Sequence, residues 1–239
     1  MPNEILFEDD HIAIVEKPAD ILIHNSYYAR NIKEKTLLEQ LKEAMGFSLY
    51  PIHRLDRKTS GLIMLAKQKH DVAKFQSLFE NNSIQKSYLA VVRGFVLESI
   101  CIDSPVKHPE TGVYKNAETT CIPISNHLLD IPVYPYKQSR YSLVELKPTT
   151  GRIHQLRIHM NKISHPIIGD AKYGDRFHNR MFEKEMDCSK ILLHAYSLVF
   201  KHPITLKSLH VKSNHCPPHW QKLIDKLCWN EEIKTVFKK

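Results

Sequence analysis

The stretch YPIHRLDRKTSGL combines one carboxylate, Asp56, with cationic neighbours that include Arg54, Arg57 and Lys58. Neighbouring cations favour the ionised form of a carboxylate, and the same cations bind phosphate groups. An ionised carboxylate beside a bound nucleotide can act as a nucleophile or as a general base. The alternative is a turn residue that only caps nearby backbone amides. The residue types alone leave both interpretations open.

The elements that must position this carboxylate are two short strands. YPIH, before Asp56, has the character of a short strand, and GLIMLA (Gly61–Ala66) is a continuous apolar run of strand length. The sequence therefore predicts that Asp56 lies in a loop between two strands, where active residues are common.

Helix and strand patterns alternate irregularly along the rest of the chain. Mixed elements without β-α-β alternation favour the α+β class, and the absence of a linker-like segment favours one domain over residues 1–239. The patterns predict helices over Thr36–Met45 (Thr36 as N-cap, Glu39 completing a capping box, Gly46 as the stop), Asp71–Asn82, Arg152–Lys162 and a terminal segment from Pro217. They predict a short hairpin of Ile5–Asp10 and His11–Pro18, and strands over Ser87–Val92, Tyr141–Pro148, Ile191–Phe200 and Thr205–Lys212.

Composition narrows the function classes. The formal net charge of +8 and the pI of about 9.1 have two interpretations. Either the protein binds an anionic partner, for which nucleic acid is the first candidate, or it merely has a basic surface. The five cysteines form no C-x-x-C pair, which indicates reduced thiols and a cytoplasmic protein. We expect no signal peptide and no membrane span.

The sequence gives little support for a metal site or for a site that binds a nucleoside triphosphate. Fifteen histidines are present, but none form an H-E-x-x-H motif, and His154 and His159 are spaced to fall on different helix faces. The seven glycines are isolated, so no phosphate-cradling loop is predicted. We expect no metal and no organic cofactor, and keep a metal-dependent hydrolase as a distant alternative.

Four ordered blocks carry a resemblance to a known family. HRLDRKTSGLIMLAK, KSYLAVVRG, ELKPTTGRIHQLRIH and HPIIGDAKYG resemble, in this order, the motifs of the RluA-type pseudouridine synthases. The resemblance covers about Ile5 to His210. It implies a mixed, mostly antiparallel sheet with flanking helices and a central active-site cleft, and it implies a single catalytic domain without the S4 module of some members.

The resemblance also implies roles for individual residues. Asp56 is the catalytic aspartate, Arg54 helps flip the target uridine, Tyr88 stacks on the flipped base, and Arg157 pairs with the catalytic carboxylate. Stacking on Tyr88 would offset part of the cost of extruding a base, and an arginine pair would hold the carboxylate ionised. The alternatives are that Tyr88 is plain strand core and that Arg157 is a solvated helix residue, although its place beside the apolar face of the helix argues against the latter.

The expected substrate is structured RNA. The stretches IGDAKYGDRFHNRMF and ILIHNSY are most similar to the branch of the family that modifies a uridine in the T stem of certain tRNAs, which makes uridine-65 of tRNA the expected target. An rRNA target is the alternative within the family, and a non-catalytic RNA-binding or RNA-folding module is the alternative of another class. We expect a monomer. The candidate RNA-binding residues are Arg54, Arg57, Lys58, Lys86, Arg152, His154, Lys172 and Arg176, and weaker candidates are Arg140, Arg180 and Lys33–Lys35.

Overall fold

The computed structural model describes residues 4–25, 34–214, 216–227 and 229–237, so Lys33 of the weaker candidates lies outside it. The chain divides into two compact units. The first unit is Met1–Gln85 with Ala195–Ser213, and the second is Lys86–His194 with Asn214–Lys239. The expected single catalytic domain with a central cleft stays a prediction, and each unit is described by itself.

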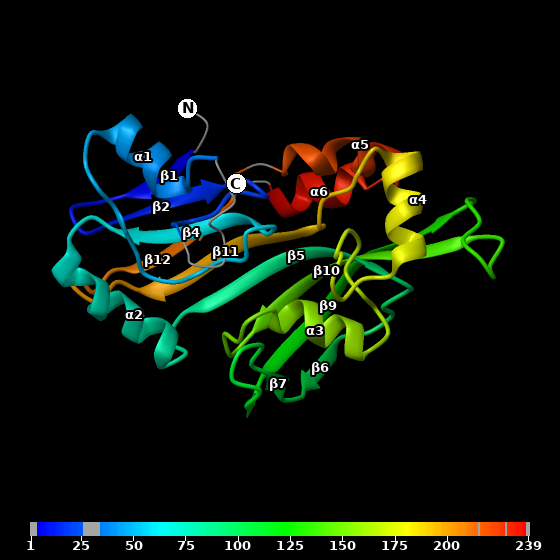
Figure 1. Ribbon diagram of the computed structural model, residues 1–239, viewed down its shortest axis with the longest axis horizontal. Helices are drawn as coiled ribbons and strands as arrows, with labels where there is room; N and C mark the ends of the chain where they lie inside the picture. Colours follow the sequence, from blue (N-terminus) through cyan, green and yellow to red (C-terminus); the bar gives the residue numbers. More distant parts are fainter. Residues whose placement is uncertain (1–3, 26–33, 215, 228, 238–239) are drawn as a thin grey trace. The chain divides into compact units, whose positions relative to one another are not determined.

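The first unit is built on antiparallel strand pairs that flank the candidate loop. Its strands follow the order β1-β2-β4-β11, with β3 paired to β4 and β12 to β11. The described elements are β1 (Ile5–Glu8), β2 (Ile12–Lys17), α1 (Leu37–Met45), β3 (Tyr50–Pro51), β4 (Ser60–Ala66), a 3-10 turn (Lys69–Asp71), α2 (Val72–Glu80), β11 (Leu193–Lys201) and β12 (Ser208–Lys212) (Figure 1).

Strand β4 is buried over its whole length, as expected for a continuous apolar run. Its Leu62 and Met64 share one core with Ile14 of β2 and with Phe75 of α2. The apolar face of α2 therefore covers the sheet of the first unit next to the strand that follows Asp56.

The predicted capping box of α1 is confirmed. The Thr36 hydroxyl accepts a hydrogen bond from the backbone N–H of Glu39, and the Glu39 carboxylate accepts one from the backbone N–H of Thr36. Gly46 ends the helix at φ 78°, a left-handed conformation that glycine adopts without strain.

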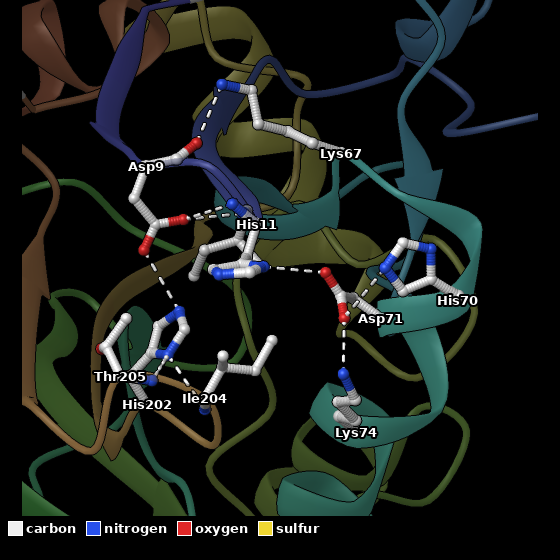
Figure 2. Close-up of polar contacts among 10 residues, drawn as sticks. Asp9, His11, Lys67, His70, Asp71, Lys74, His202, Ile204 and Thr205 are labelled. Atoms are coloured by element: carbon white, nitrogen blue, oxygen red, sulfur yellow. Dashed lines mark hydrogen bonds and ion pairs between the residues drawn. The ribbon is translucent and has the colours of Figure 1, made fainter.

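A polar network ties the β1–β2 turn to two other turns of the first unit (Figure 2). Asp9 accepts hydrogen bonds from the backbone N–H groups of His11 and Ile12, and its other oxygen lies 3.1 Å from Nε2 of buried His202. Nδ1 of His202 accepts backbone N–H groups of the β11–β12 turn. His11 Nδ1 lies 2.9 Å from the Asp71 carboxylate at the start of α2.

Helix α2 begins at Val72, one residue later than predicted, after a 3-10 turn. The reason is that the Asp71 side chain makes no cap to α2 and instead pairs with His11 and, at 2.9 Å, with Lys74. Burial alone would raise the pKa of the Asp71 carboxyl, but the hydrogen bonds from His11 and Lys74 outweigh burial and hold that pKa below its usual range.

The main strands of the second unit follow the order β5-β10-β9-β6. Its β10 pairs are antiparallel on both sides, and β6 pairs antiparallel with β9. The described elements are β5 (Gln85–Arg93), β6 (Ile100–Asp103), β7 (Val106–Lys107), β8 (Tyr114–Lys115), β9 (Glu118–Leu129), β10 (Ser139–Pro148), α3 (Gln155–Lys162), α4 (Arg176–Met186), α5 (Pro218–Lys226) and α6 (Asn230–Phe237).

Helices pack on these strands through two different sets of strand residues. Leu156 and Met160 of α3 join the core that Val144 and Leu146 of β10 form. Tyr141 of β10 instead meets Phe182 of α4, with ring centroids 4.8 Å apart. The α+β class and the mostly antiparallel sheet pairing are thus confirmed.

Two helix boundaries differ from prediction. Helix α3 begins at Gln155 rather than Arg152, because His154 takes a left-handed φ of 57° and the Gln155 side chain binds the turn before it. The terminal segment forms two helices. Leu227 caps α5, and Glu231 and Glu232 supply the acidic first turn that favours a new helix start.

None of the helices within the described residues combines the length and the apolar character that crossing a membrane requires.

Asp71→Asn is predicted to lower the free energy of unfolding at pH 7 by about 1–3 kcal/mol, because a buried charge-assisted network loses its acceptor. Since the pKa of Asp71 is lowered, this stabilisation is present above the ordinary aspartate pKa of about 3.9 and is lost as pH falls through the folded-state value. Urea unfolding at pH 7 and near pH 3 measures both effects.

The matched control is Asp10→Asn, at an exposed position of the neighbouring turn, which should leave unfolding unchanged. Equal stability of wild type and Asp71→Asn at pH 7 would contradict the role assigned to this network.

Candidate active site

Asp56 lies, as predicted, in the loop between β3 and β4. It is half-buried, and its carbonyl oxygen accepts a hydrogen bond from the Thr59 N–H at 3.0 Å, which closes a turn. Arg54, Arg57 and Lys58 are exposed around it. One donor of the Arg57 guanidinium is already used within the protein, because its Nε donates a hydrogen bond to the Asp20 carbonyl at 2.9 Å. The loop thus presents cations to solvent beside a sheltered carboxylate.

A buried lysine holds the backbone of this loop through hydrogen bonds. Lys17, at the end of β2, is 0% exposed, and its Nζ donates to the carbonyl oxygens of Pro18, Ile21 and Arg57. Burial lowers the pKa of Lys17 to about 7, while the negative charges of Asp20 and Asp56 oppose that shift. The bond to the Arg57 carbonyl, at 2.9 Å, attaches the residue after Asp56 to the sheet of the first unit.

The two ends of the loop are fixed by close packing. His53 Nε2 accepts the backbone N–H of Met64 at 3.0 Å, and its ring stacks on Phe79 at 4.4 Å. Gly61 has φ 107°, and a Cβ there would come within 2.2 Å of the Ala195 backbone. Only glycine permits this approach of β4 to β11. His53 therefore has a structural role in this loop.

In the second unit, Arg157 is buried and doubly bonded to a carboxylate. Its Nε and a terminal NH₂ group donate to the two oxygens of Asp170 at 2.7 and 2.8 Å, a bidentate pair. Burial would raise the pKa of Asp170, but the Arg157 guanidinium and the backbone N–H groups of Lys172 and Tyr173 hold it below its usual range. The reading of Arg157 as a solvated residue is wrong, since its side chain is 8% exposed.

Two other candidates gather around the same arginine. The Arg157 guanidinium lies 5.2 Å from the ring centre of Tyr173, and the Lys172 ammonium lies 5.3 Å from it. His154 Nδ1 is 3.1 Å from the Tyr173 hydroxyl. Arg157, His154 and Lys172 therefore share one aromatic neighbour, with Lys172 exposed and Arg157 enclosed.

The turn before α3 is held by one amide side chain. Gln155 Oε1 accepts from the Arg152 N–H at 2.9 Å and from the Thr150 hydroxyl, and its Nε2 donates to the Glu118 carbonyl. Lys86 donates to the Thr150 carbonyl at 3.4 Å. Its side chain is buried, and burial, then the charge of Arg152, lowers its pKa. Arg152 is exposed, whereas Lys86 is enclosed.

Tyr88 is half-buried on β5, opposite Leu146 of β10, and packs against the core of the second unit. Its position fits both a stacking residue and a strand core residue. Arg176, the last RNA-binding candidate, is exposed at the first position of α4 with its guanidinium 4.7 Å from the Phe177 ring centre.

The candidates divide between the two units. Asp56, Arg54, Arg57 and Lys58 belong to the first unit, and the other candidates belong to the second. The pairing of Arg157 with Asp56 and the joint action of Tyr88 with them stay predictions.

Sequence reasoning missed three supporting residues, Lys17, Gln155 and Asp170. Each carries a polar group that is buried and fully engaged, a property that no local spacing reveals. The sequence signal that could have indicated two of them is their position in the blocks that resemble the family motifs. Gln155 lies in GRIHQLRIH, and Asp170 lies in HPIIGDAKYG. Within the described residues, no group of three or more His, Cys, Asp or Glu side chains could hold a metal ion.

Comparison with known proteins gives the family. A family model described as RNA pseudouridylate synthase matches residues 11–162, which include Asp56, Tyr88 and Arg157. This chain is a member of the RNA pseudouridylate synthase family. The fold agrees: the structure of human RNA Pseudouridylate Synthase Domain Containing 1 matches 89% of this chain and 83% of its own, with a TM-score of 0.70 and 25% identity.

Several curated relatives are similar over nearly their full length. Proteins named tRNA pseudouridine synthase C are 39% identical in Yersinia pestis (95% of this chain, 91% of that protein) and 37% identical in Pasteurella multocida (96% and 98%). The one from Vibrio cholerae is 33% identical (96% and 98%).

Lys17→Met is predicted to lower activity about tenfold while RNA affinity stays close to wild type, because the buried ammonium positions the Asp56 loop without reaching the surface. Three carbonyls lose their donor, so the free energy of unfolding should fall by about 1–3 kcal/mol. Since the folded pKa of Lys17 lies below the unfolded one, wild-type stability should rise between about pH 7 and 10.5, and this rise should be absent in the variant.

Single-turnover kinetics, RNA binding and urea unfolding at pH 7 and 9 measure these effects. Activity equal to wild type, or a matching loss of RNA affinity, would contradict a positioning role for Lys17.

Asp170→Asn is predicted to cost about 3 kcal/mol or more in the free energy of unfolding, because it leaves the buried Arg157 without its counter-charge. Asp130→Asn, at an exposed position of the same unit, is the control and should have no effect. A loss below about 1 kcal/mol would show that the pair does not hold Arg157 in place.

Proposed function

We propose that this protein isomerises uridine to pseudouridine in tRNA, with uridine-65 of the T stem as its target. The observation that carries the proposal is Asp56, placed in a cation-rich loop inside the segment that matches the family model. The relatives named tRNA pseudouridine synthase C support tRNA as the substrate.

The reaction breaks the C1′–N1 bond of the uridine, rotates the uracil and joins C1′ to C5. The hydrogen at C5 leaves and N1 gains one, so the overall change is an isomerisation. Asp56 either attacks C1′ to give a covalent ester or removes a proton from the sugar to give a glycal, as a nucleophile or as a base. Both routes need a sheltered carboxylate, because water that trapped the intermediate would prevent the second bond from forming.

The other residues take roles around this step. Tyr88 stacks on the extruded uracil, Arg54 occupies the space that it leaves, and Arg157 orients the Asp56 carboxylate. The exposed cations Arg57, Lys58, Arg152, Lys172 and Arg176 and the half-buried His154 contact the RNA backbone, and Lys86 contacts it from the base of the Thr150 turn. The protein acts as one catalytic domain, as a monomer and in the cytoplasm. A tRNA substrate and the reduced cysteines expected from the sequence support the last assignment.

An rRNA substrate is the second candidate, favoured by the family description, which names RNA without naming tRNA. A non-catalytic RNA-binding module keeps the exposed cations but has no use for Asp56. The pH and stability effects above would not separate these candidates, so a chemical readout is needed.

Asp56→Asn is predicted to abolish pseudouridine formation, with a loss of at least about 10³-fold, while tRNA affinity stays within about threefold of wild type. The measurement is pseudouridine mapping of total tRNA and rRNA from a strain that lacks the endogenous activity, after incubation with each protein. The control is Asp10→Asn, which should give the wild-type map.

A new pseudouridine at position 65 of tRNA supports the proposal, and one confined to rRNA replaces it with the second candidate. Identical maps with and without active protein would remove the enzymatic function altogether.

A further inference from the structure

The hairpin of β9 and β10 ends in a loop that exposes aromatic side chains. Tyr134 is 89% exposed and Tyr136 67%, and Tyr134 is the most exposed large apolar side chain in the described part of the chain. Aromatic rings of this size are normally at least half-buried, since each can remove a large apolar area from water. Two such rings displayed on one loop indicate a surface that another molecule covers.

The loop holds these rings outward through its own inward contacts. Val133, between Pro132 and Tyr134, is buried, and its carbonyl accepts the Tyr136 N–H at 2.9 Å. Leu129 and Ser139, at the two strand ends, are buried as well. The tyrosines are therefore presented by an anchored turn, which lowers the entropy lost when a ligand stacks on them.

Two exposed cations lie in the loop of these rings or directly after it. Lys137 is exposed in the loop, and Arg140 is exposed on β10 with its guanidinium 5.7 Å from the ring centre of Phe95. Across the hairpin, Arg140 lies opposite Leu128, which is 45% exposed. The nearby acid is Asp130, which accepts a hydrogen bond from Gln138 at 3.4 Å. The sign of the local charge is thus mainly positive.

The start of α4 adds to the same region of the second unit. His178 of α4 lies 2.7 Å from the hydroxyl of Tyr141, the residue after Arg140. Arg93, whose neighbour Gly94 donates its N–H to the Arg140 carbonyl, pairs with Asp175 at 2.6 Å. These contacts bring exposed Arg176 and Phe177 to the base of the hairpin, as Figure 1 shows for α4.

We propose that the hairpin-tip surface (Leu128, Tyr134, Tyr136, Lys137 and Arg140) is an RNA-binding surface that stacks unpaired bases of the substrate. Rings with interleaved cations suit single-stranded nucleic acid, because the rings take base faces and the cations take phosphates. A mainly apolar protein partner would leave Lys137 and Arg140 unpaired. The proposal rests on the proposed function for its RNA substrate and extends recognition beyond the residues that act on the uridine.

The test compares Tyr134→Ser/Tyr136→Ser with Tyr134→Phe/Tyr136→Phe in equilibrium binding to folded tRNA and to a blunt, fully paired RNA duplex. The serine variant should bind tRNA about tenfold or more weakly, because each lost stacking contact is costly. The phenylalanine variant should bind like wild type, since the ring and not the hydroxyl does the stacking. Binding to the duplex, which offers no unpaired base, should be the same for all three proteins.

Two further variants check the assignment. Lys137→Gln/Arg140→Gln should reduce the slope of log affinity against log salt by about 1–2 on both RNAs. Leu206→Ser, which removes a side chain 64% exposed on the first unit, should change neither affinity nor slope. Pseudouridine formation at saturating tRNA should be unchanged in the serine variant, with KM raised in parallel with Kd.

The proposal is overturned if the serine variant binds tRNA within twofold of wild type, or if it loses affinity for the duplex equally. It is also overturned if the phenylalanine variant is as weak as the serine variant. Because binding is read without turnover, a wild-type protein that binds tRNA through these rings but forms no pseudouridine would reject the proposed function and leave this surface intact.

Discussion

The bidentate pair between Arg157 and Asp170 is the interaction on which the proposed catalytic role of Arg157 depends. A buried guanidinium cannot lose its proton, so burial is tolerated only with a carboxylate in fixed geometry. In the first unit a lysine is buried instead, and the Nζ of Lys17 is satisfied by three carbonyl oxygens beneath the Asp56 loop. In each unit a buried cation thus fixes a backbone segment that carries proposed catalytic residues, while exposed cations are left for RNA.

Local features were predictable from the sequence because their causes are local. The Thr36 capping box, the stop at Gly46 and the loop position of Asp56 depend on residues a few places apart. Long-range partners were not predictable from spacing, because Arg157 and Asp170 are 13 positions apart and the sequence between them contains no pattern that indicates one as the other's counter-ion. The start of α3 was missed for a related reason, since the side chain of Gln155 competes with helix formation at Arg152.

The family resemblance supplied an expectation that spacing could not, namely which carboxylate, tyrosine and arginine would act in one reaction. The family model then matched the segment that holds all three. What the resemblance did not indicate is the hairpin-tip surface, which was visible only when the structure showed that Tyr134 and Tyr136 remain exposed while Val133 between β9 and β10 is buried. An apolar residue in a turn-rich sequence does not reveal whether it faces the core or solvent.

The proposed role of Asp56 is to exchange a C–N bond for a C–C bond at C1′ of the target uridine. Release of tritium from tRNA labelled at C5 of uridine measures this exchange, because that hydrogen leaves only when C1′ joins C5. Wild type is expected to release tritium in step with pseudouridine formation, and Asp56→Asn is expected to release none above background while tRNA binding is retained. Release at the wild-type rate by Asp56→Asn, or pseudouridine formation without release, would contradict this role.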